Sequence, residues 1–347
     1  MADRLDEAGF VVTTTTVVPR RHPKGAGLAP LAGYLARRLL SAAVVVAIVS
    51  MLVFAFVHAA PGGPERSIGG RFATAEQLVA IREQYRLNDP LWTQYGQFVS
   101  SALGLDFGTS YSMREPVTDS ISRAASTTVP LVLFGWLAAL LIGTALGVVS
   151  ARHAGGAFDR GVLGFTVVGA SAPIFATAIL LSYVFGVALG WLPTLGEGDG
   201  GMDRIRHLVL PGVTLAIAAM AAITKVTKVR VGQVLEADHI TFATARGLPP
   251  RGVLVSEVLR NSGVQLVTQA GAVLVAMLSA VILVEEVFDL DGLGSLLIQA
   301  ITARDIPLIQ AITLFTCIFI VAVNLVVDLV CMAIDPRLRI GRGGVTR

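Results

Sequence analysis

Charged residues, lysine and cysteine are all scarce in this chain of 347 residues. Only 15% of the residues are charged, whereas soluble domains usually carry about 25%. Apolar residues make up 54% of the chain and stand in long uninterrupted runs. This pattern excludes a soluble enzyme, a disordered protein and a fibrous repeat. With a mean hydropathy of +0.72, the composition is typical of an integral membrane protein.

The few cysteines and lysines exclude several further classes. Cys317 and Cys331 both stand in the last apolar run, which excludes a disulfide scaffold and a cysteine-rich metal site. None of the lysines (Lys24, Lys225 and Lys228) follows a glycine, so the chain lacks the G-x-x-x-x-G-K-[ST] loop that holds ATP phosphates. The histidines include no H-E-x-x-H motif. We therefore predict no catalytic, cofactor-binding or metal-binding residue, and the scattered basic residues indicate no nucleic-acid partner.

Six apolar runs are candidates for membrane spans. A helix that crosses the roughly 30 Å of hydrocarbon needs about 20 apolar residues, and such a helix is expected in a run without Asp, Glu, Lys or Arg. The third run, residues 161–196, is long for one span, so we expect its helix to end near Gly190 and a loop to follow. The predicted fold is an all-α polytopic bundle of six membrane-spanning helices. Their expected bounds are about residues 39–60, 124–151, 161–190, 208–232, 262–284 and 306–333.

The distribution of charge predicts the orientation of the chain in the membrane. Six spans place both termini on one face, together with residues 152–160 and 225–260. That face, which includes the end from residue 328, carries 18 Lys and Arg against 9 Asp and Glu. The opposite face carries 9 Lys and Arg against 15 Asp and Glu. Because positive charge favours the cytoplasmic side, we expect both termini in the cytoplasm.

The spans and their connections divide the chain into three parts. We expect a cytoplasmic tail without fixed structure over residues 1–33, a membrane domain over 34–340 and a short cytoplasmic tail over 341–347. Two connections within the membrane domain are longer than a linker needs. Residues 65–123 predict an ordered external cap. Residues 225–261 predict a short cytoplasmic helix, a turn and a second helix that leads into the fifth span.

One external segment is predicted to contain helices, and another is predicted to be a flexible turn. Within the cap, helical patterns cover residues 75–85 and 91–103, separated by a break at Asn-Asp-Pro. Residues 196–201 read G-E-G-D-G-G and formally contain a G-x-G-x-x-G motif. The acidic side chains of Glu197 and Asp199 would repel a phosphate, so we interpret this loop as a flexible turn.

Ionisable residues inside membrane spans often mark ion or proton paths, and the apolar runs are almost free of them. Only Asp328 qualifies, four residues after Asn324 near the cytoplasmic end of the last span. We interpret it as a partner in an interfacial or interhelical hydrogen bond. A proton-coupled secondary transporter would carry mid-membrane carboxylates or histidines, or inverted repeats, and none is visible in the sequence. An intramembrane enzyme would need a nucleophile and a base paired within the spans, and none is visible either.

The cytoplasmic residues 237–248, which we call the coupling segment, resemble the E-A-A-x-x-x-G loop of ABC-importer permeases. Thr241, Phe242, Ala243 and Gly247 stand at the E, A, A and G positions, and the last two match strictly. Gly247 can adopt the left-handed conformation that ends a helix. A short helix with an exposed Phe and small neighbours suits a groove on another protein. From the residues alone, a helix held in the lipid headgroups by arginines fits equally well.

Five further motifs resemble the first permease (B-type subunit) of the oligopeptide/dipeptide, or peptide/nickel, ABC-importer family, and the likeness covers about residues 34–340. They are A-P-G-G-P at 60–64, L-N-D-P-L-W-T-Q-Y at 87–95, D-F-G-T-S at 106–110, F-D-L-D-G-L-G at 288–294 and D-P-R at 335–337. The family pattern has Asp and Pro where this chain has Gly63 and Asp291. Each motif stands in its expected place relative to the spans.

The resemblance implies the permease bundle of a type I ABC importer in a bacterial inner membrane. The implied partners are a second, different permease, two cytoplasmic ATP-binding subunits and an external peptide-binding protein. ATP and magnesium would be bound by the ATPase partners, so this chain would hold no cofactor and catalyse no reaction. The implied substrates are dipeptides and oligopeptides. Nickel or a nickel chelate is the alternative, because nickel permeases share these signatures.

Two groups of residues are candidate functional sites under this resemblance. The first lies in the coupling segment and is expected to join the chain to its ATPase partners. It comprises Asp238, Thr241, Phe242, Ala243, Arg246, Gly247 and Leu248. The second is expected at the external cap or at an outer gate of the path. It comprises Asp106, Phe107, Gly108, Glu285, Asp291 and Gly292.

Overall fold

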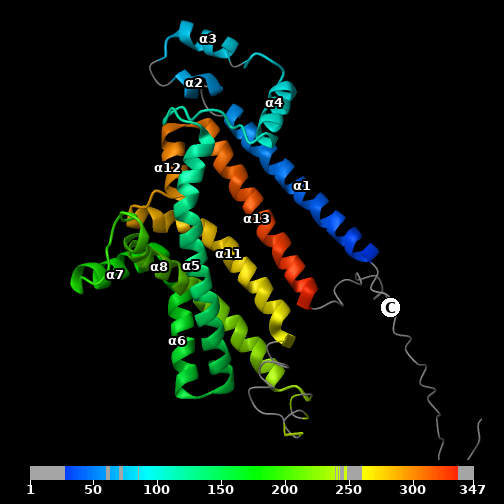
Figure 1. Cartoon of the computed structure of the whole chain (residues 1–347), viewed down its shortest axis with the longest axis vertical. Helices are drawn as coiled ribbons and strands as arrows, with labels where there is room; N and C mark the ends of the chain where they lie inside the picture. Colours follow the sequence, from blue (N-terminus) through cyan, green and yellow to red (C-terminus); the bar gives the residue numbers. More distant parts are fainter. Residues whose placement is uncertain are drawn as a thin grey trace, which may run out of the picture.

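Helices make up most of the described chain (Figure 1). The computed structural model describes residues 28–59, 63–69, 73–84, 86–238, 240, 242, 246–247 and 260–334. Within these ranges there is no named strand, and one isolated bridge joins Thr109 to Pro116. The all-α fold predicted from the apolar runs is confirmed.

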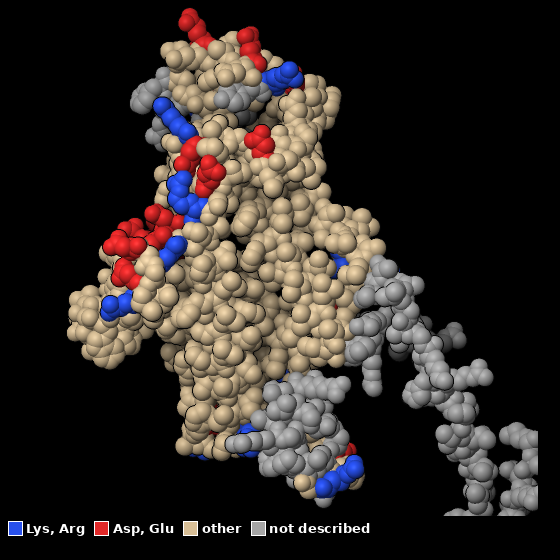
Figure 2. All heavy atoms as spheres, in the orientation of Figure 1, with Lys and Arg blue, Asp and Glu red and all other residues tan. Residues whose placement is uncertain are grey.

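Five helices of the described chain are long and apolar enough to cross a membrane. They are α1 (Leu28–Ala59), α5 (Val117–Arg152), α8 (Gly201–Leu235), α11 (Arg260–Phe288) and α13 (Ile306–Ile334). Both α5 and α8 begin about two turns before the apolar runs do, because charged residues end an apolar run without ending a helix. On the face in view, Figure 2 shows an uncharged band between charged side chains in the upper part and at the lowest end.

The third predicted span is not one continuous helix, which corrects the expectation from the sequence. α6 (Ala157–Ser171) is followed by α7 (Ile174–Leu181) and the π-helical turn η1 (Ser182–Ala188), and the two parts are bent by 109°. Pro173 explains the break, because a proline disfavours helical conformation in the residue before it. That residue, Ala172, is extended, with ψ of 127°. The bent pair is the sixth span if it crosses as one unit.

The centre of the bundle is the close contact between α5 and α8. A Cβ atom added to Gly147 of α5 would lie 2.5 Å from Cβ of Thr227. One turn earlier, the Thr224 hydroxyl of α8 donates a hydrogen bond to the Gly143 carbonyl oxygen at 3.1 Å. Small residues at this spacing let two helix backbones approach closely. The two helices therefore form one tightly packed pair, and α11 packs against both of them.

Three short helices form most of the cap beyond the ends of α1 and α13 (Figure 1). They are α2 (Gly63–Gly69), α3 (Ala75–Gln84) and α4 (Leu91–Leu103), of which the last two follow the predicted helical patterns. An ion pair between Glu65 and Arg82 fastens α2 to α3. Burial acts to raise the pKa of Glu65, but hydrogen bonds from Arg82 and the neighbouring positive charges outweigh it and leave that pKa below its ordinary value.

Asp328 of α13 forms an ion pair with Arg38 of α1. Asn324 instead donates its side-chain amide to the Ile320 carbonyl oxygen, at 3.0 Å. The interpretation of Asp328 as an interhelical partner is therefore confirmed, with Arg38 as the second residue. The pair ties α1 to the bundle at the end away from the cap (Figure 1).

Candidate functional site

The coupling segment follows α8 at the end of the bundle opposite the cap (Figure 1). The candidate residues that the structure describes are Asp238, Phe242, Arg246 and Gly247. The candidates that lie outside the described residues are Thr241, Ala243 and Leu248. Residues 248–259, where the turn and the second helix of the 225–261 region are predicted, lie outside them too.

The described part of the segment has one buried and one exposed apolar side chain. Ile240 is only 5% exposed and packs with Ala151 of α5 and Val231 of α8. Phe242 is 71% exposed, and its carbonyl oxygen accepts the Arg246 N–H at 3.1 Å, as in one turn of a helix. The bundle thus holds the segment through Ile240, while the ring of Phe242 is available to another protein.

Gly247 ends this turn in the left-handed region, with φ of +80°. The sequence predicts this conformation, because a glycine adopts it without the steric cost that a Cβ atom imposes. Apart from the glycine and its chain neighbours, no described residue has an atom within 4 Å of the position that a Cβ atom would occupy. The restriction on this residue therefore comes from the backbone conformation alone.

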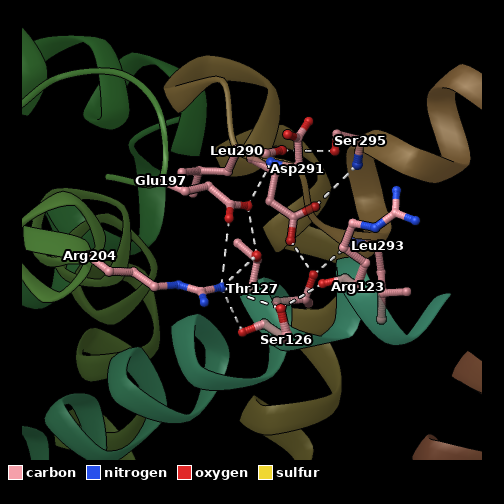
Figure 3. A network of polar contacts seen from close by, with 11 residues as sticks. Arg123, Ser126, Thr127, Glu197, Arg204, Leu290, Asp291, Leu293 and Ser295 are labelled. Atoms are coloured by element: carbon pink, nitrogen blue, oxygen red, sulfur yellow. Dashed lines mark hydrogen bonds and ion pairs between the residues drawn. The ribbon is translucent and has the colours of Figure 1, made fainter. Parts of the chain in front are cut away.

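A buried carboxylate, that of Glu285, accepts a hydrogen bond from Ser295 within the network of polar contacts in Figure 3. Glu285 of α11 has 0% exposure, and its Oε2 accepts the N–H groups of Gly294 and Ser295 at 2.7 and 3.2 Å. These amides belong to the first turn of α12 (Leu293–Ala303), a helix that the apolar runs did not predict, and such amides lack partners within their own helix. Glu285 therefore caps α12 by accepting two of these amide hydrogens.

Thr128 of α5 adds two hydrogen bonds at the N-terminus of α12. Its hydroxyl donates to Oε1 of Glu285 at 2.5 Å and accepts the Leu293 N–H at 2.7 Å. Gly292 leaves space for the carboxylate, because an added Cβ atom would lie 2.1 Å from the Glu285 side chain. Two of the predicted candidates, Glu285 and Gly292, thus form one packed unit that joins α11, α12 and α5.

The loop before α8 belongs to the same network (Figure 3), where the sequence predicts a flexible turn. Oε1 of Glu197 accepts the Thr127 hydroxyl at 2.7 Å and the Asp291 N–H at 3.0 Å. Arg204 of α8 donates to Thr127 Oγ1 at 3.0 Å and lies 3.7 Å from Oε2 of Glu197. The candidate Asp291 contributes this backbone N–H, while the residue itself is exposed. Glu197 is a functional candidate that the sequence missed, because its partners come from distant segments.

The remaining three candidates shape the loop between α4 and α5. Oδ1 of Asp106 accepts the Gly108 N–H at 3.0 Å, which closes a tight turn. Gly108 has φ of +72°, which requires a residue that tolerates the left-handed region. Phe107 packs against a buried cluster to which α5, α12 and α13 contribute. The six candidates therefore form two groups, and both groups pack around α12.

Asp305, which no sequence motif indicated, anchors the loop before α5 to the corner between α12 and α13. It has 0% exposure and accepts hydrogen bonds from the Ser110 hydroxyl at 2.5 Å, the Ser112 N–H at 2.9 Å and the Ser112 hydroxyl at 2.7 Å. Burial acts to raise the pKa of Asp305, but these hydrogen bonds outweigh it and hold the pKa below its ordinary value. A partner 193 residues away leaves no local signal in the sequence.

Two family models cover most of the chain. Residues 31–132 match the N-terminal part of the binding-protein-dependent transport system membrane component, and residues 143–340 match the binding-protein-dependent transport system inner membrane component. The chain belongs to this family. It is therefore a permease subunit of an ABC importer and a multi-pass protein of the inner membrane, as the motifs in the sequence implied.

Relatives of similar length place the chain within the peptide type of this family. It is 35% identical over 309 residues to the Probable peptide ABC transporter permease protein y4tP of Sinorhizobium fredii (strain NBRC 101917 / NGR234), which covers 88% of this chain and 99% of the relative. It is 37% identical over 306 residues to the Glutathione transport system permease protein GsiC of Escherichia coli (strain K12), which covers 88% and 98%. Both relatives are transport subunits, and no enzyme family is indicated.

Solved structures show that the bundle has the fold of a type I importer permease. One is described as inward facing conformations of the MetNI methionine ABC transporter, CY5 SeMet soak crystal form; its TM-score is 0.53 at 17% identity, over 62% of this chain and 96% of that chain. The CY5 native crystal form gives a TM-score of 0.51 at 16% identity over the same shares. The predicted fold class is confirmed.

Proposed function

We propose that this chain is one of two different permease subunits of an importer for dipeptides and oligopeptides. Two ATPase subunits bind ATP and Mg²⁺ and hydrolyse the ATP, and a binding protein delivers the peptide. Two relatives support this substrate class, one a probable peptide permease and the other a permease for glutathione, which is itself a tripeptide. The motifs at residues 87–95 and 106–110 point to the same class.

The proposed orientation places the coupling segment and both termini in the cytoplasm. It is supported by the excess of basic residues on that face, 18 Lys and Arg against 9 Asp and Glu. The coupling segment then lies on the side where ATP is available. The cap, residues 65–123, lies on the outer side, where a binding protein can dock on it.

The proposed coupling mechanism rests on the exposure of the Phe242 side chain. A groove on an ATPase subunit takes the ring, as grooves take the apolar anchors of short helices. When the two ATPase subunits close around ATP, they displace the coupling segment. Because Ile240 packs with α5 and α8, the displacement passes into these helices. The bundle then alternates between two arrangements that open the path to one side at a time.

Purification of the intact complex tests this proposal. A tag on this chain should recover the second permease and both ATPase subunits, and peptide-loaded binding protein should stimulate ATP hydrolysis in reconstituted vesicles. If a nickel-loaded binding protein stimulates ATP hydrolysis and a peptide-loaded one does not, the substrate is nickel and not a peptide. Recovery of the chain alone, active in transport without ATPase subunits, would overturn the proposal.

A further inference from the structure

An ion pair between a buried carboxylate and a partly exposed ammonium group connects α6 to α8 beside the coupling segment. Asp159, in the first turn of α6, is 4% exposed and pairs with the ammonium group of Lys228 on α8. The Ser150 hydroxyl, in the last turn of α5, donates to Oδ1 of the same carboxylate. The Gly155 N–H, in the turn between α5 and α6, donates to Oδ2 at 2.9 Å. One carboxylate thus connects α5, α6 and α8.

The ion pair borders the cluster that holds the coupling segment. Ser150 precedes Ala151 in α5, and Lys228 stands one turn before Val231 in α8. Ala151 and Val231 are the residues that pack with Ile240. The ion pair is therefore one layer away from the contact through which the coupling segment is held.

An ion pair is not the only arrangement that could stabilise this helix contact. Replacing a buried ion pair with apolar residues of similar size is often neutral or stabilising. The α5–α8 contact at this end is already close, because Gly147 packs directly against Thr227. α6, in contrast, buries only a narrow stripe. Its buried residues are Asp159, Val162, Thr166 and Gly169. The ion pair is thus a polar contact at the N-terminal end of the buried stripe of α6.

We infer that Asp159 and Lys228 are positioning residues for coupling, which fasten α6 to the helix that carries the coupling segment. When the segment moves, α8 moves with it, and the ion pair makes α6 follow. The bend at Ala172 and Pro173 then transmits the motion to α7. This inference rests on the proposed function, since it assumes that ATPase subunits displace the coupling segment.

The number of ATP molecules hydrolysed per transported peptide tests the inference, in vesicles that contain the complete importer. Asp159→Asn and Lys228→Met should leave assembly and the maximal ATPase rate unchanged but raise this ratio severalfold. Lys225→Met is the matched control, because Lys225 is exposed on the same helix, and its ratio should stay that of the wild type.

A chemical cross-link distinguishes a mechanical role of the ion pair from a merely structural one. Asp159→Cys and Lys228→Cys are introduced into a chain without Cys317 and Cys331, and a bifunctional thiol reagent then joins the two positions. Cross-linking should return the ratio of ATP to peptide toward the wild-type value. If a charge variant does not assemble, this measurement still shows whether a link between the two positions is needed for coupling.

Two results would overturn the inference while leaving the proposed function intact. One is a wild-type ratio in both single variants. The other is an uncoupled importer that cross-linking does not rescue. Failure of the wild-type complex to hydrolyse ATP in response to peptide-loaded binding protein would instead refute the proposed function.

Discussion

Phe242→Ala should weaken the association between the permease pair and its ATPase subunits. The ring is 71% exposed in this chain, so docking can remove most of its apolar surface from water. Full burial of a phenylalanine side chain contributes about 1.5–3 kcal/mol. The exposed share of the ring corresponds to about 1–2 kcal/mol, and the dissociation constant should rise about fivefold to thirtyfold. Ile240 is unchanged in this variant, so the segment should keep its place on the bundle.

Titration of the immobilised permease pair with purified ATPase subunits measures this dissociation constant. Phe242→Leu keeps an apolar side chain and should recover most of the affinity. Phe56→Ala removes a ring that is equally exposed, at 72%, on α1, and it should leave the affinity unchanged. An unchanged dissociation constant for Phe242→Ala would refute the docking role, and an equal loss in Phe56→Ala would show that the effect is not local.

Four further changes test other parts of the structure. Gly247→Val should keep membrane insertion but abolish peptide-stimulated ATP hydrolysis, because a left-handed conformation costs a residue with a Cβ atom about 1–2 kcal/mol; wild-type stimulation in vesicles would contradict this. Gly292→Ala should lower the midpoint of thermal unfolding, because its Cβ atom would meet the Glu285 side chain at 2.1 Å; an unchanged midpoint would argue against the cap on α12. Asp305→Ala should speed hydrogen exchange in the loop before α5, and equal protection would exclude the anchor. Because the folded pKa of Asp305 is lowered, its stabilisation is fully present above the pKa of unfolded Asp, about 3.9, and is lost as the pH falls through the folded pKa. A single cysteine at Thr346 should react only with reagents on the cytoplasmic side, and labelling from outside would refute the orientation.

Local patterns in the sequence predict some features closely. The helix over residues 91–103 has the predicted bounds, because Pro90 and Gly104 flank an amphipathic stretch at its two ends. Gly247 has the predicted left-handed conformation, because glycine is the residue that adopts it at least cost. In both cases a few neighbouring residues determine the structure, so the signal is contained in one short segment.

Features that depend on contacts between distant segments are not predicted from the sequence. Residues 169–173, G-A-S-A-P, predict a kink inside the third apolar run. Hydropathy does not change where the helix breaks, so the size of the bend, 109°, is not predicted. Asp159 follows the second apolar run, so the sequence places it in the connection 152–160, yet it is buried and pairs with Lys228 of α8. Glu285 was a candidate, but its role in capping α12 depends on Thr128, 157 residues away. Such partners become visible only once the helices are packed.

Peptide uptake by vesicles that contain the complete importer tests the central claim most directly. With ATP enclosed on the side of the coupling segment, labelled peptide delivered by the binding protein should accumulate inside the vesicles. Accumulation should be lost when ATP is omitted or when Gly247→Val replaces the wild-type chain. Uptake of the same peptide by this chain alone, driven by an ion gradient without ATPase subunits, would contradict the account.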